Sequence, residues 1–291
     1  MNRGTTLAKT ENMREIWLLG FVVMIVGLGS STAFALDPMG PPMANLKQGQ
    51  FELGADYSYS TMDLKLNKGT YVEYIDGGFN EAGEAESFTL KNFKTNRVYA
   101  NMGYGFADNW GAFLRVGGAN AKFGDSIWEA GERFDGLTDF SIGLGAKATF
   151  YEDDNLKIGG LFQVNWSELD GKLKPAGWPT FDYPGADCVE IELAEIQLAV
   201  GPTYKLTDNV LIYGGPFFHF VDGDLDDVYS DIERETGFFL TSKYSWAIEE
   251  TSTFGGYIGA RVEFTENCSF DIEYQHTSAA DAFGVSLMWR F

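Results

Sequence analysis

The last ten residues of the chain, AFGVSLMWRF (282–291), alternate between apolar side chains and side chains that are mostly small or polar. A repeat of two residues places one set of side chains on a single face of an extended strand. The stretch therefore predicts a β-strand with one apolar face that ends on an aromatic residue. The apolar positions are Phe283, Val285, Leu287, Trp289 and Phe291.

The composition of the whole chain favours one β-rich body. Its 291 residues include 35 Gly, 24 Phe, 14 Tyr and 7 Trp but only 8 Pro. A mean hydropathy of −0.15 is compatible with membrane strands, because alternating strands average their hydropathy away. A formal net charge of −21 argues against binding to nucleic-acid phosphates.

The amino-terminal region reads as an export signal. An apolar run at 16–29 follows the basic residues Arg3, Lys9 and Arg14 and precedes Ala33-Phe34-Ala35. This order predicts a secretory signal peptide, residues 1–35, cleaved after Ala35. The proline-rich, aperiodic segment 36–49 is then a periplasmic lead-in, and residues 50–291 form the main domain.

Short polar turns recur along the chain and alternate with longer connections. Each short turn is flanked on both sides by alternating apolar runs, as tight hairpins require. Four short turns and five connections on the opposite side predict ten antiparallel strands with both termini on the side of the short turns. The short turns lie in 104–110, 149–156, 204–210 and 263–268, and the other connections in 67–88, about 124–136, 170–190, 222–243 and 277–281.

One face of every predicted strand is free of charge. No Asp, Glu, Lys or Arg occurs on these faces, although charged residues make up 22% of the chain. An Arg or Lys facing the middle of a bilayer costs roughly 2–4 kcal/mol, so these faces are predicted to contact lipid. Aromatic residues at the strand ends fit the two membrane interfaces, namely Tyr57, Tyr59, Tyr104, Phe106, Trp110, Phe150, Trp166, Phe264, Trp289 and Phe291.

This pattern, and above all a closing strand that stops at a carboxy-terminal Phe, resembles the outer-membrane β-barrels of Gram-negative bacteria. The resemblance implies an all-β, antiparallel, transmembrane up-and-down barrel of about ten strands, with short periplasmic turns and long extracellular loops. It also implies location in the cell outer membrane, contact with lipopolysaccharide, and insertion by the barrel assembly machinery, which reads the last strand as an address.

Charged residues on the opposite faces are predicted to point into the lumen. Hairpin pairing sets Arg261 opposite Asp271, and the seam between the first and last strands brings Glu52 near Arg290. These charges are either a salt-bridge network that fills the barrel or a charged constriction in a narrow channel for small solutes. Ten strands lie near the width that side chains alone can fill. The predicted lumen charges are Glu52, Asp56, Arg97, Arg115, Lys147, Lys157, Glu195, Lys205, Arg261, Glu263, Asp271, Glu273 and Arg290.

The acidic connection at 222–243 contains a weak calcium pattern. Asp222, Asp224, Asp226 and Glu233 stand at positions 1, 3, 5 and 12, the spacing of a Ca²⁺-binding loop. Asp227 occupies the sixth position, where that loop needs Gly. A solvated acidic loop, bridged by divalent ions to lipopolysaccharide, is the alternative. No other cofactor is predicted.

The two histidines do not form a recognisable catalytic pattern. His219 falls on the inner face near the outer rim, where it is expected to hydrogen-bond near Gln197, and His276 falls on the lipid face. Ten-stranded omptin proteases use an Asp-x-His element, whereas Phe217 and Tyr274 stand at the Asp position here. An enzyme of that kind is therefore disfavoured.

The two cysteines are predicted to lie on opposite sides of the membrane. Cys188 falls at the outer end of the third long loop, and Cys268 follows a periplasmic turn. An apolar band of about 25 Å separates those levels, and a disulfide needs Cα atoms about 4.4–6.8 Å apart. No bridge between them is expected.

The sequence thus predicts a non-enzymatic outer-membrane barrel, acting as a narrow passive channel or as a membrane-stabilising surface protein. Recognition of a partner through the long acidic loops is the alternative function.

Overall fold

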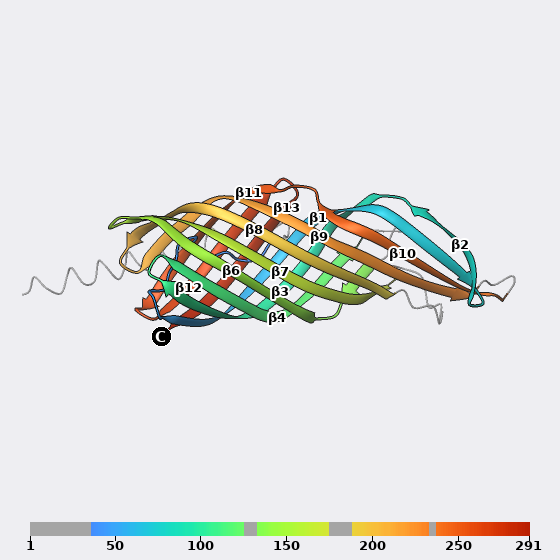
Figure 1. Cartoon of the computed structure of the whole chain (residues 1–291), viewed down its shortest axis with the longest axis horizontal. Helices are drawn as coiled ribbons and strands as arrows, with labels where there is room; N and C mark the ends of the chain where they lie inside the picture. Colours follow the sequence, from blue (N-terminus) through green and yellow to red (C-terminus); the bar gives the residue numbers. More distant parts are fainter. Residues whose placement is uncertain (1–35, 125–132, 175–187, 233–236) are drawn as a thin grey trace, which may run out of the picture. The chain divides into compact units, whose positions relative to one another are not determined.

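The described part of the chain consists mostly of β-strands and contains no helix (Figure 1). The computed structural model describes residues 36–124, 133–174, 188–232 and 237–291, which form an antiparallel sheet of 13 strands. No helix among these residues is long and apolar enough to cross a membrane. The strands are β1 (Phe51–Ile75), β2 (Gly78–Ala85), β3 (Phe88–Ala107), β4 (Trp110–Gly124), β5 (Arg133–Gly136), β6 (Asp139–Glu152), β7 (Leu156–Lys174), β8 (Cys188–Thr207), β9 (Val210–Ile232), β10 (Phe239–Glu250), β11 (Phe254–Thr265), β12 (Cys268–Thr277) and β13 (Ala280–Arg290).

The sheet closes on itself where the first and last strands meet. Strand β1 pairs with β13 from Glu52↔Arg290 to Met62↔Ala280, and the amide of Phe291 donates to the carbonyl of Phe51 at 2.9 Å. The predicted closing strand and the predicted count of ten are therefore confirmed. We call the closed set β1, β3, β4, β6, β7, β8, β9, β11, β12 and β13 the membrane-level ring.

The barrel continues beyond this ring with fewer strands. Strand β10 follows β9 and pairs directly with β1 from Leu64↔Glu250 to Ile75↔Leu240, beyond the end of the β12–β13 hairpin. Strand β5 takes the place of β6 between β4 and β7. The extracellular part is thus a closed set of eight strands, the outer ring, made of β1, β3, β4, β5, β7, β8, β9 and β10.

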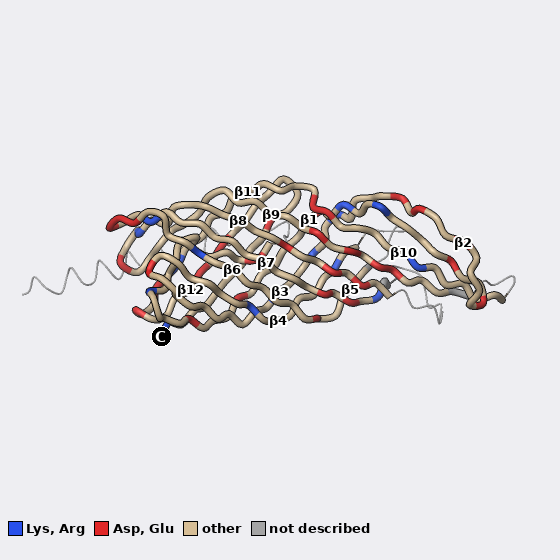
Figure 2. The backbone as a smooth tube through the Cα atoms, viewed as in Figure 1, with Lys and Arg blue, Asp and Glu red and all other residues tan. Residues whose placement is uncertain are grey.

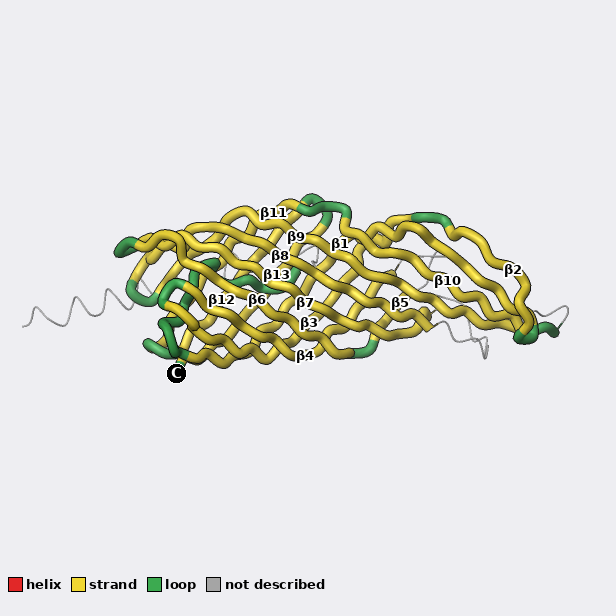
Figure 3. Tube along the Cα trace, viewed as in Figure 1, coloured by secondary structure: helices red, strands yellow, loops and turns green. Residues whose placement is uncertain are grey.

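The predicted long loops are largely strands, which corrects the sequence analysis (Figure 3). The connection 67–88 consists of the end of β1, the whole of β2 and the start of β3. The connection 222–243 consists of the end of β9 and the start of β10, with residues 233–236 outside the described part. Residues 125–132 and 175–187 of two other predicted loops also lie outside it. The described residues of 67–88 and 222–243 pair with neighbouring strands, so the hydrogen-bonded ladders continue past the membrane.

The outside of the membrane-level ring carries the predicted lipid face. Large apolar side chains are open to the surroundings there, for example Val98, Leu144 and Ile258, which are 57%, 57% and 65% exposed. Aromatic residues at both edges are exposed as well, with Phe264 at the periplasmic end of β11 and Phe254 at its outer end. In a soluble protein so many exposed apolar side chains would drive association, whereas in a bilayer they contact acyl chains.

Apolar side chains lie on the outer face of the strands within the membrane, and on the inner face where the strands extend beyond it. On β8, Ile196 and Leu198 face outward, but Ile191 and Leu193 of the same strand face inward and are fully buried. On β1, the outward Tyr57 is likewise followed by inward apolar residues such as Leu64. Outside the bilayer water replaces lipid, so the hydrophobic effect turns the apolar side chains toward the lumen.

The segment before β1 lies inside the barrel, which contradicts the predicted periplasmic lead-in. Residues 36–44 and Leu46 are buried, and only 47–49 are exposed. At Gly159 a side chain would meet the backbone of Pro42 and Met43, and at Gly105 it would meet the carbonyl of Lys47. Inward glycines therefore make room for this segment rather than for a solute path.

Candidate functional site

The lumen of the outer ring is filled by an apolar cluster, which we call the outer core. Aromatic rings stack through it, with Phe123 lying 6.0 Å from Phe93 and 4.7 Å from Phe134 between ring centroids. Eight strands enclose about the volume that side chains alone fill, so this region is packed like the interior of a soluble protein. Its buried members are Met62, Leu64, Leu66, Leu90, Phe93, Ala119, Ala121, Phe123, Phe134, Leu169, Val189, Ile191, Leu193, Val221, Leu225, Trp246, Ile248 and Ala280.

The lumen of the membrane-level ring is polar and is occupied by residues 36–46, which we call the amino-terminal plug. Its carboxylate Asp37 is 1% exposed, lies 3.0 Å from Arg97 and accepts a hydrogen bond from Ser58 at 2.9 Å. The carbonyl of Asp37 accepts hydrogen bonds from the amides of Gln163 at 3.4 Å and Gln275 at 2.7 Å. Four strands thus hold a single residue of the plug.

The next residues of the plug are also held by the wall. The carbonyl of Pro38 accepts a hydrogen bond from Arg115, and the amide of Met39 donates to Glu273 at 2.9 Å. The amide of Ala44 donates to Thr149 at 3.1 Å. The side chains of Leu36 and Met39 pack in a small apolar cluster with Leu161, Ala199, Tyr213, Phe217, Tyr257 and Ala282.

His219 belongs to a buried charged group beside the plug. Arg97 contacts Glu195 as well as Asp37, and Nε2 of His219 lies 3.5 Å from Oε1 of Glu195. Gln197 is the register partner of His219, but its side chain bonds to Gln163 and Gln275. The expected hydrogen bond near Gln197 is therefore replaced by a contact with Glu195.

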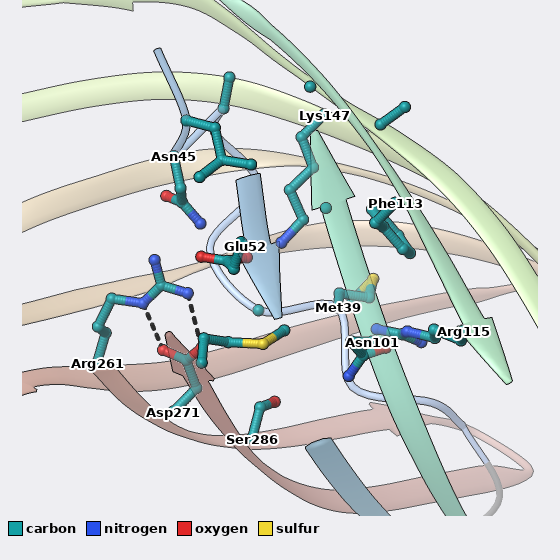
Figure 4. Close-up of a pocket in the computed structure, with 17 residues that line it drawn as sticks. Met39, Asn45, Glu52, Asn101, Phe113, Arg115, Lys147, Arg261, Asp271 and Ser286 are labelled. Carbon is teal, nitrogen blue, oxygen red and sulfur yellow. Dashed lines mark hydrogen bonds and ion pairs between the residues drawn. The ribbon is translucent and has the colours of Figure 1, made fainter. Parts of the chain in front are cut away.

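The predicted cross-strand ion pairs are both present. Arg261 holds Asp271 through two hydrogen bonds of 2.6 and 2.7 Å (Figure 4), and both side chains are almost fully buried. At the seam, Arg290 lies 3.8 Å from Glu52 and 2.7 Å from Glu263. Asp56 accepts from Asn101 and lies 3.5 Å from Arg115.

A cavity of about 50 Å³ remains between the plug and the wall. Lys147 and Arg115 share one aromatic neighbour there, with Nζ 5.8 Å and Cζ 5.0 Å from the ring centroid of Phe113. Lys147, Glu52 and Arg261 point into this space (Figure 4). A volume of this size holds a few water molecules and is too small for a continuous solute path.

The periplasmic mouth is lined by four of the predicted lumen charges, namely Lys157, Lys205, Glu263 and Arg290. Lys157 pairs with Glu152 at 2.6 Å and Lys205 with Asp208 at 2.8 Å. These lysines line an open hollow of about 320 Å³. Hydrogen bonding and charge attraction from Lys205 lower the pKa of Asp208.

The predicted calcium loop has the wrong conformation, because β9 runs through Asp222, Asp224 and Asp226 as a strand. These three residues are exposed on its outer face, and consecutive side chains on one face of a strand diverge rather than converge on an ion. Glu233 lies outside the described residues. The backbone therefore does not support Ca²⁺ binding with loop spacing.

Acidic residues are frequent along the strands of the outer ring (Figure 2), and several of them are exposed and stand opposite one another on neighbouring strands. Asp170 pairs with Glu190, which pairs with Asp226. Carboxylate oxygens of Glu168, Glu190 and Glu192 approach within 4.8 Å of one another, so these three could hold a cation. Burial and the neighbouring carboxylates of Asp170 and Glu168 raise the pKa of Glu190. We call this surface the acidic face.

His276 and Asp281 contact each other at the outer edge of the lipid face. They are cross-strand partners on β12 and β13, and Asp281 also accepts a hydrogen bond from Tyr274 at 2.7 Å. The nearby Ser278 donates its hydrogen bond to Ser252 at 2.9 Å. The Ser278 hydroxyl is thus directed to Ser252 and not to this imidazole, whereas catalysis by a serine nucleophile requires a base within hydrogen-bond reach.

Cys188 and Cys268 are free thiols. Cys188 opens β8 in the outer ring, and Cys268 opens β12 after the turn that joins it to β11.

The sequence analysis placed Arg97, Arg115 and Glu273 in the lumen, but it missed the uncharged polar residues that bind the plug. Gln163 and Gln275 lie on the inward parity of their strands, so alternation alone could have placed them in the lumen. Nothing in the local pattern marks Asp37, because the plug has no period and its partners are distant in sequence.

Several solved structures of outer-membrane proteins align with this chain. Outer membrane protease OmpT from Escherichia coli aligns over 82% of this chain and 97% of its own at 10% identity, with a TM-score of 0.41. The translocator domain of autotransporter NalP from Neisseria meningitidis covers 98% of this chain and 97% of its own at 9% identity and a TM-score of 0.40. Outer membrane protein OprG from Pseudomonas aeruginosa covers 73% and 96% at 11% identity and a TM-score of 0.30. Likenesses at these identities and TM-scores carry no argument.

No protein-family model and no curated protein matches the sequence. The closed antiparallel ring, its uncharged exterior band and its aromatic edges define the class. The chain is an outer-membrane β-barrel protein.

Proposed function

We propose that this protein is a closed, non-conducting, non-enzymatic barrel that acts as a rigid surface structure anchored in the outer membrane. The observation that carries the proposal is the outer core, which fills the outer ring with buried apolar side chains. An ion crossing this region would have to leave water for a dry apolar medium, which costs far more than a wet path. The lumen charges are thus better explained as a salt-bridge network that fills the barrel than as the constriction of a channel.

A planar-bilayer recording of the refolded protein tests this proposal. We expect no stable conductance steps from the wild-type protein. We also expect none from a variant that lacks residues 36–46, because the outer core still closes the outer ring. Discrete, reproducible steps from the wild-type protein would contradict the proposal and would favour a narrow channel.

Recognition by the extracellular surface is the second candidate function. The acidic face favours it, because like-charged residues directly opposite each other destabilise a sheet and are retained here on three neighbouring strands. A partner with a cationic surface would relieve that repulsion. Binding of a basic protein or peptide to intact cells should then weaken as ionic strength rises, and binding independent of salt would contradict this function.

A further inference from the structure

The plug is bound as a peptide ligand would be. The carboxylate of Asp37 contacts Arg97 and Ser58, and its carbonyl accepts from Gln163 and Gln275. The carbonyl of Pro38 accepts from Arg115, and the amide of Met39 donates to Glu273. The first side chain, Leu36, is 1% exposed and packs against aromatic residues of the wall. Main-chain contacts combined with a side-chain pocket are the usual means of recognising an extended peptide.

The charges around these residues do not balance. Three buried carboxylates, Asp37, Glu195 and Glu273, surround the start of the plug. In the described part of the chain, Arg97 is the only Lys or Arg within ion-pair distance of any of them. Oε1 of Glu195 and Oε2 of Glu273 also make no hydrogen bond of good geometry, although Nε2 of His219 lies 3.5 Å from Oε1 of Glu195 and the Tyr213 hydroxyl and Lys147 interact with Glu273. Buried carboxylates without compensation are costly, so the site calls for a further cation that donates hydrogen bonds.

We propose that this cation is the α-ammonium group of Leu36, and that the lumen is a binding site for the mature amino terminus of this same chain. Cleavage after Ala35 converts the Leu36 nitrogen from an uncharged amide into a cation with three donors. That cation stands one residue before Asp37 and three before Met39, the residues that contact Arg97 and Glu273. Signal removal thereby completes the buried site.

The proposal deepens the closed-barrel function but concerns the membrane-level ring alone. Conductance of the wild-type barrel would contradict the proposed function, but it would not contradict the binding of the amino terminus in the lumen. A mature terminus found elsewhere would defeat this inference and leave the outer core intact.

The first experiment is an intact-mass measurement on protein extracted from outer membranes, followed by amine labelling of the folded protein. We expect a mass that begins at Leu36. Near neutral pH the α-amine reacts in preference to lysine, because its pKa is about 7.7–8.0 against about 10.4. We expect its labelling to be at least roughly tenfold slower in the folded than in the urea-unfolded protein, with exposed Lys68 as the internal control. A different terminus, or equal labelling in both states, would overturn the proposal.

The second experiment moves the terminus without changing the plug. A Gly-Ser insertion between Ala35 and Leu36 keeps the predicted cleavage sequence but displaces the ammonium by two residues. We expect a lower unfolding midpoint and an α-amine that labels freely. The matched control is the same insertion between Asp153 and Asp154, which are exposed in the turn between β6 and β7, and it should be neutral. If the insertion before Leu36 is as neutral as its control, the ammonium does not stabilise the folded barrel and the proposal fails; a destabilising His219→Gln would then identify His219 as the main polar partner of Glu195.

Discussion

The two rings of this barrel close the lumen by different means. The outer ring has eight strands and is filled by its own apolar side chains, whereas the membrane-level ring has ten strands and is filled by polar side chains and the plug. Barrel width grows with strand number, and eight strands leave just enough room for side chains. Two additional strands therefore create a space that the wall alone does not fill, and residues 36–46 occupy it.

The environment outside each ring explains which side chains face inward. In the membrane the apolar side chains are needed against lipid, so polar and charged residues fall to the lumen and must be paired there. Outside the membrane the exterior faces water, so the apolar residues can form a core. The outer ring is thus built like a soluble protein, and the membrane-level ring like a soluble protein turned inside out.

The largest expected effect comes from opening a cavity in the outer core. Phe93 is 0% exposed and stacks on Phe123, so Phe93→Ala should lower the free energy of unfolding by about 3–5 kcal/mol. Urea unfolding followed by gel mobility of the folded barrel measures this. The conservative Phe93→Leu should cost less than about 1.5 kcal/mol. A loss below about 1 kcal/mol for Phe93→Ala would show that water already enters the outer core.

A smaller effect is expected in the membrane-level ring at the Arg261–Asp271 pair. Asp271→Ala leaves a buried guanidinium without its partner, but both residues line the small cavity, where water can replace some of the lost hydrogen bonds. We therefore expect a loss of about 1–3 kcal/mol without conductance.

The matched control removes both charges of this pair. The double substitution Arg261→Met with Asp271→Leu should recover most of the stability, because no unpaired charge remains. If Asp271→Ala cost as much as Phe93→Ala, the cavity would be dry and the contrast between the two rings would weaken.

Loosening the plug should have a more modest effect. Asp37→Asn keeps the size of the side chain but removes the charge that faces Arg97, and we expect a loss of about 1–2 kcal/mol in thermal or urea unfolding. Gln48→Ala, among the exposed residues between the plug and β1, is the control and should be neutral. An unchanged midpoint for Asp37→Asn would mean that the plug does not stabilise the membrane-level ring.

The smallest effect is expected on the acidic face, and its direction depends on pH. Burial and neighbouring carboxylates raise the pKa of Glu190, so the folded protein binds this proton more tightly than the unfolded chain does. Its ionisation therefore costs stability as pH rises through that range.

Glu190→Gln should accordingly stabilise the protein by about 0.2–0.5 kcal/mol near pH 7 and have no effect near pH 4, where the carboxyl is largely protonated. Unfolding midpoints at the two pH values measure the difference. Glu84→Gln on the solvent-exposed strand β2 provides the comparison. A lower stability of Glu190→Gln at neutral pH would indicate that Glu190 has a favourable cationic partner.

Several site residues could be placed from the sequence because they follow strand parity. Arg261 and Asp271 flank a short turn, so their pairing follows from hairpin register alone. The change of apolar side at Leu64 and Ile191 is also a local signal. It was overlooked because glycine-rich, acidic segments outside a membrane were expected to be loops. The strands continue there because the inward apolar residues supply a core.

The sequence by itself determined the period of the strands, the ten-strand ring, the lipid face and the seam that ends at Phe291. Each of these follows from alternation over a few residues, because only the uncharged side of such a strand can contact the lipid of a bilayer. Only the tertiary structure decided what fills the lumen and where the ring narrows to eight strands. The plug is fixed by contacts such as that between Met39 and Glu273, 234 positions apart in sequence, and no local pattern encodes a partner at that distance.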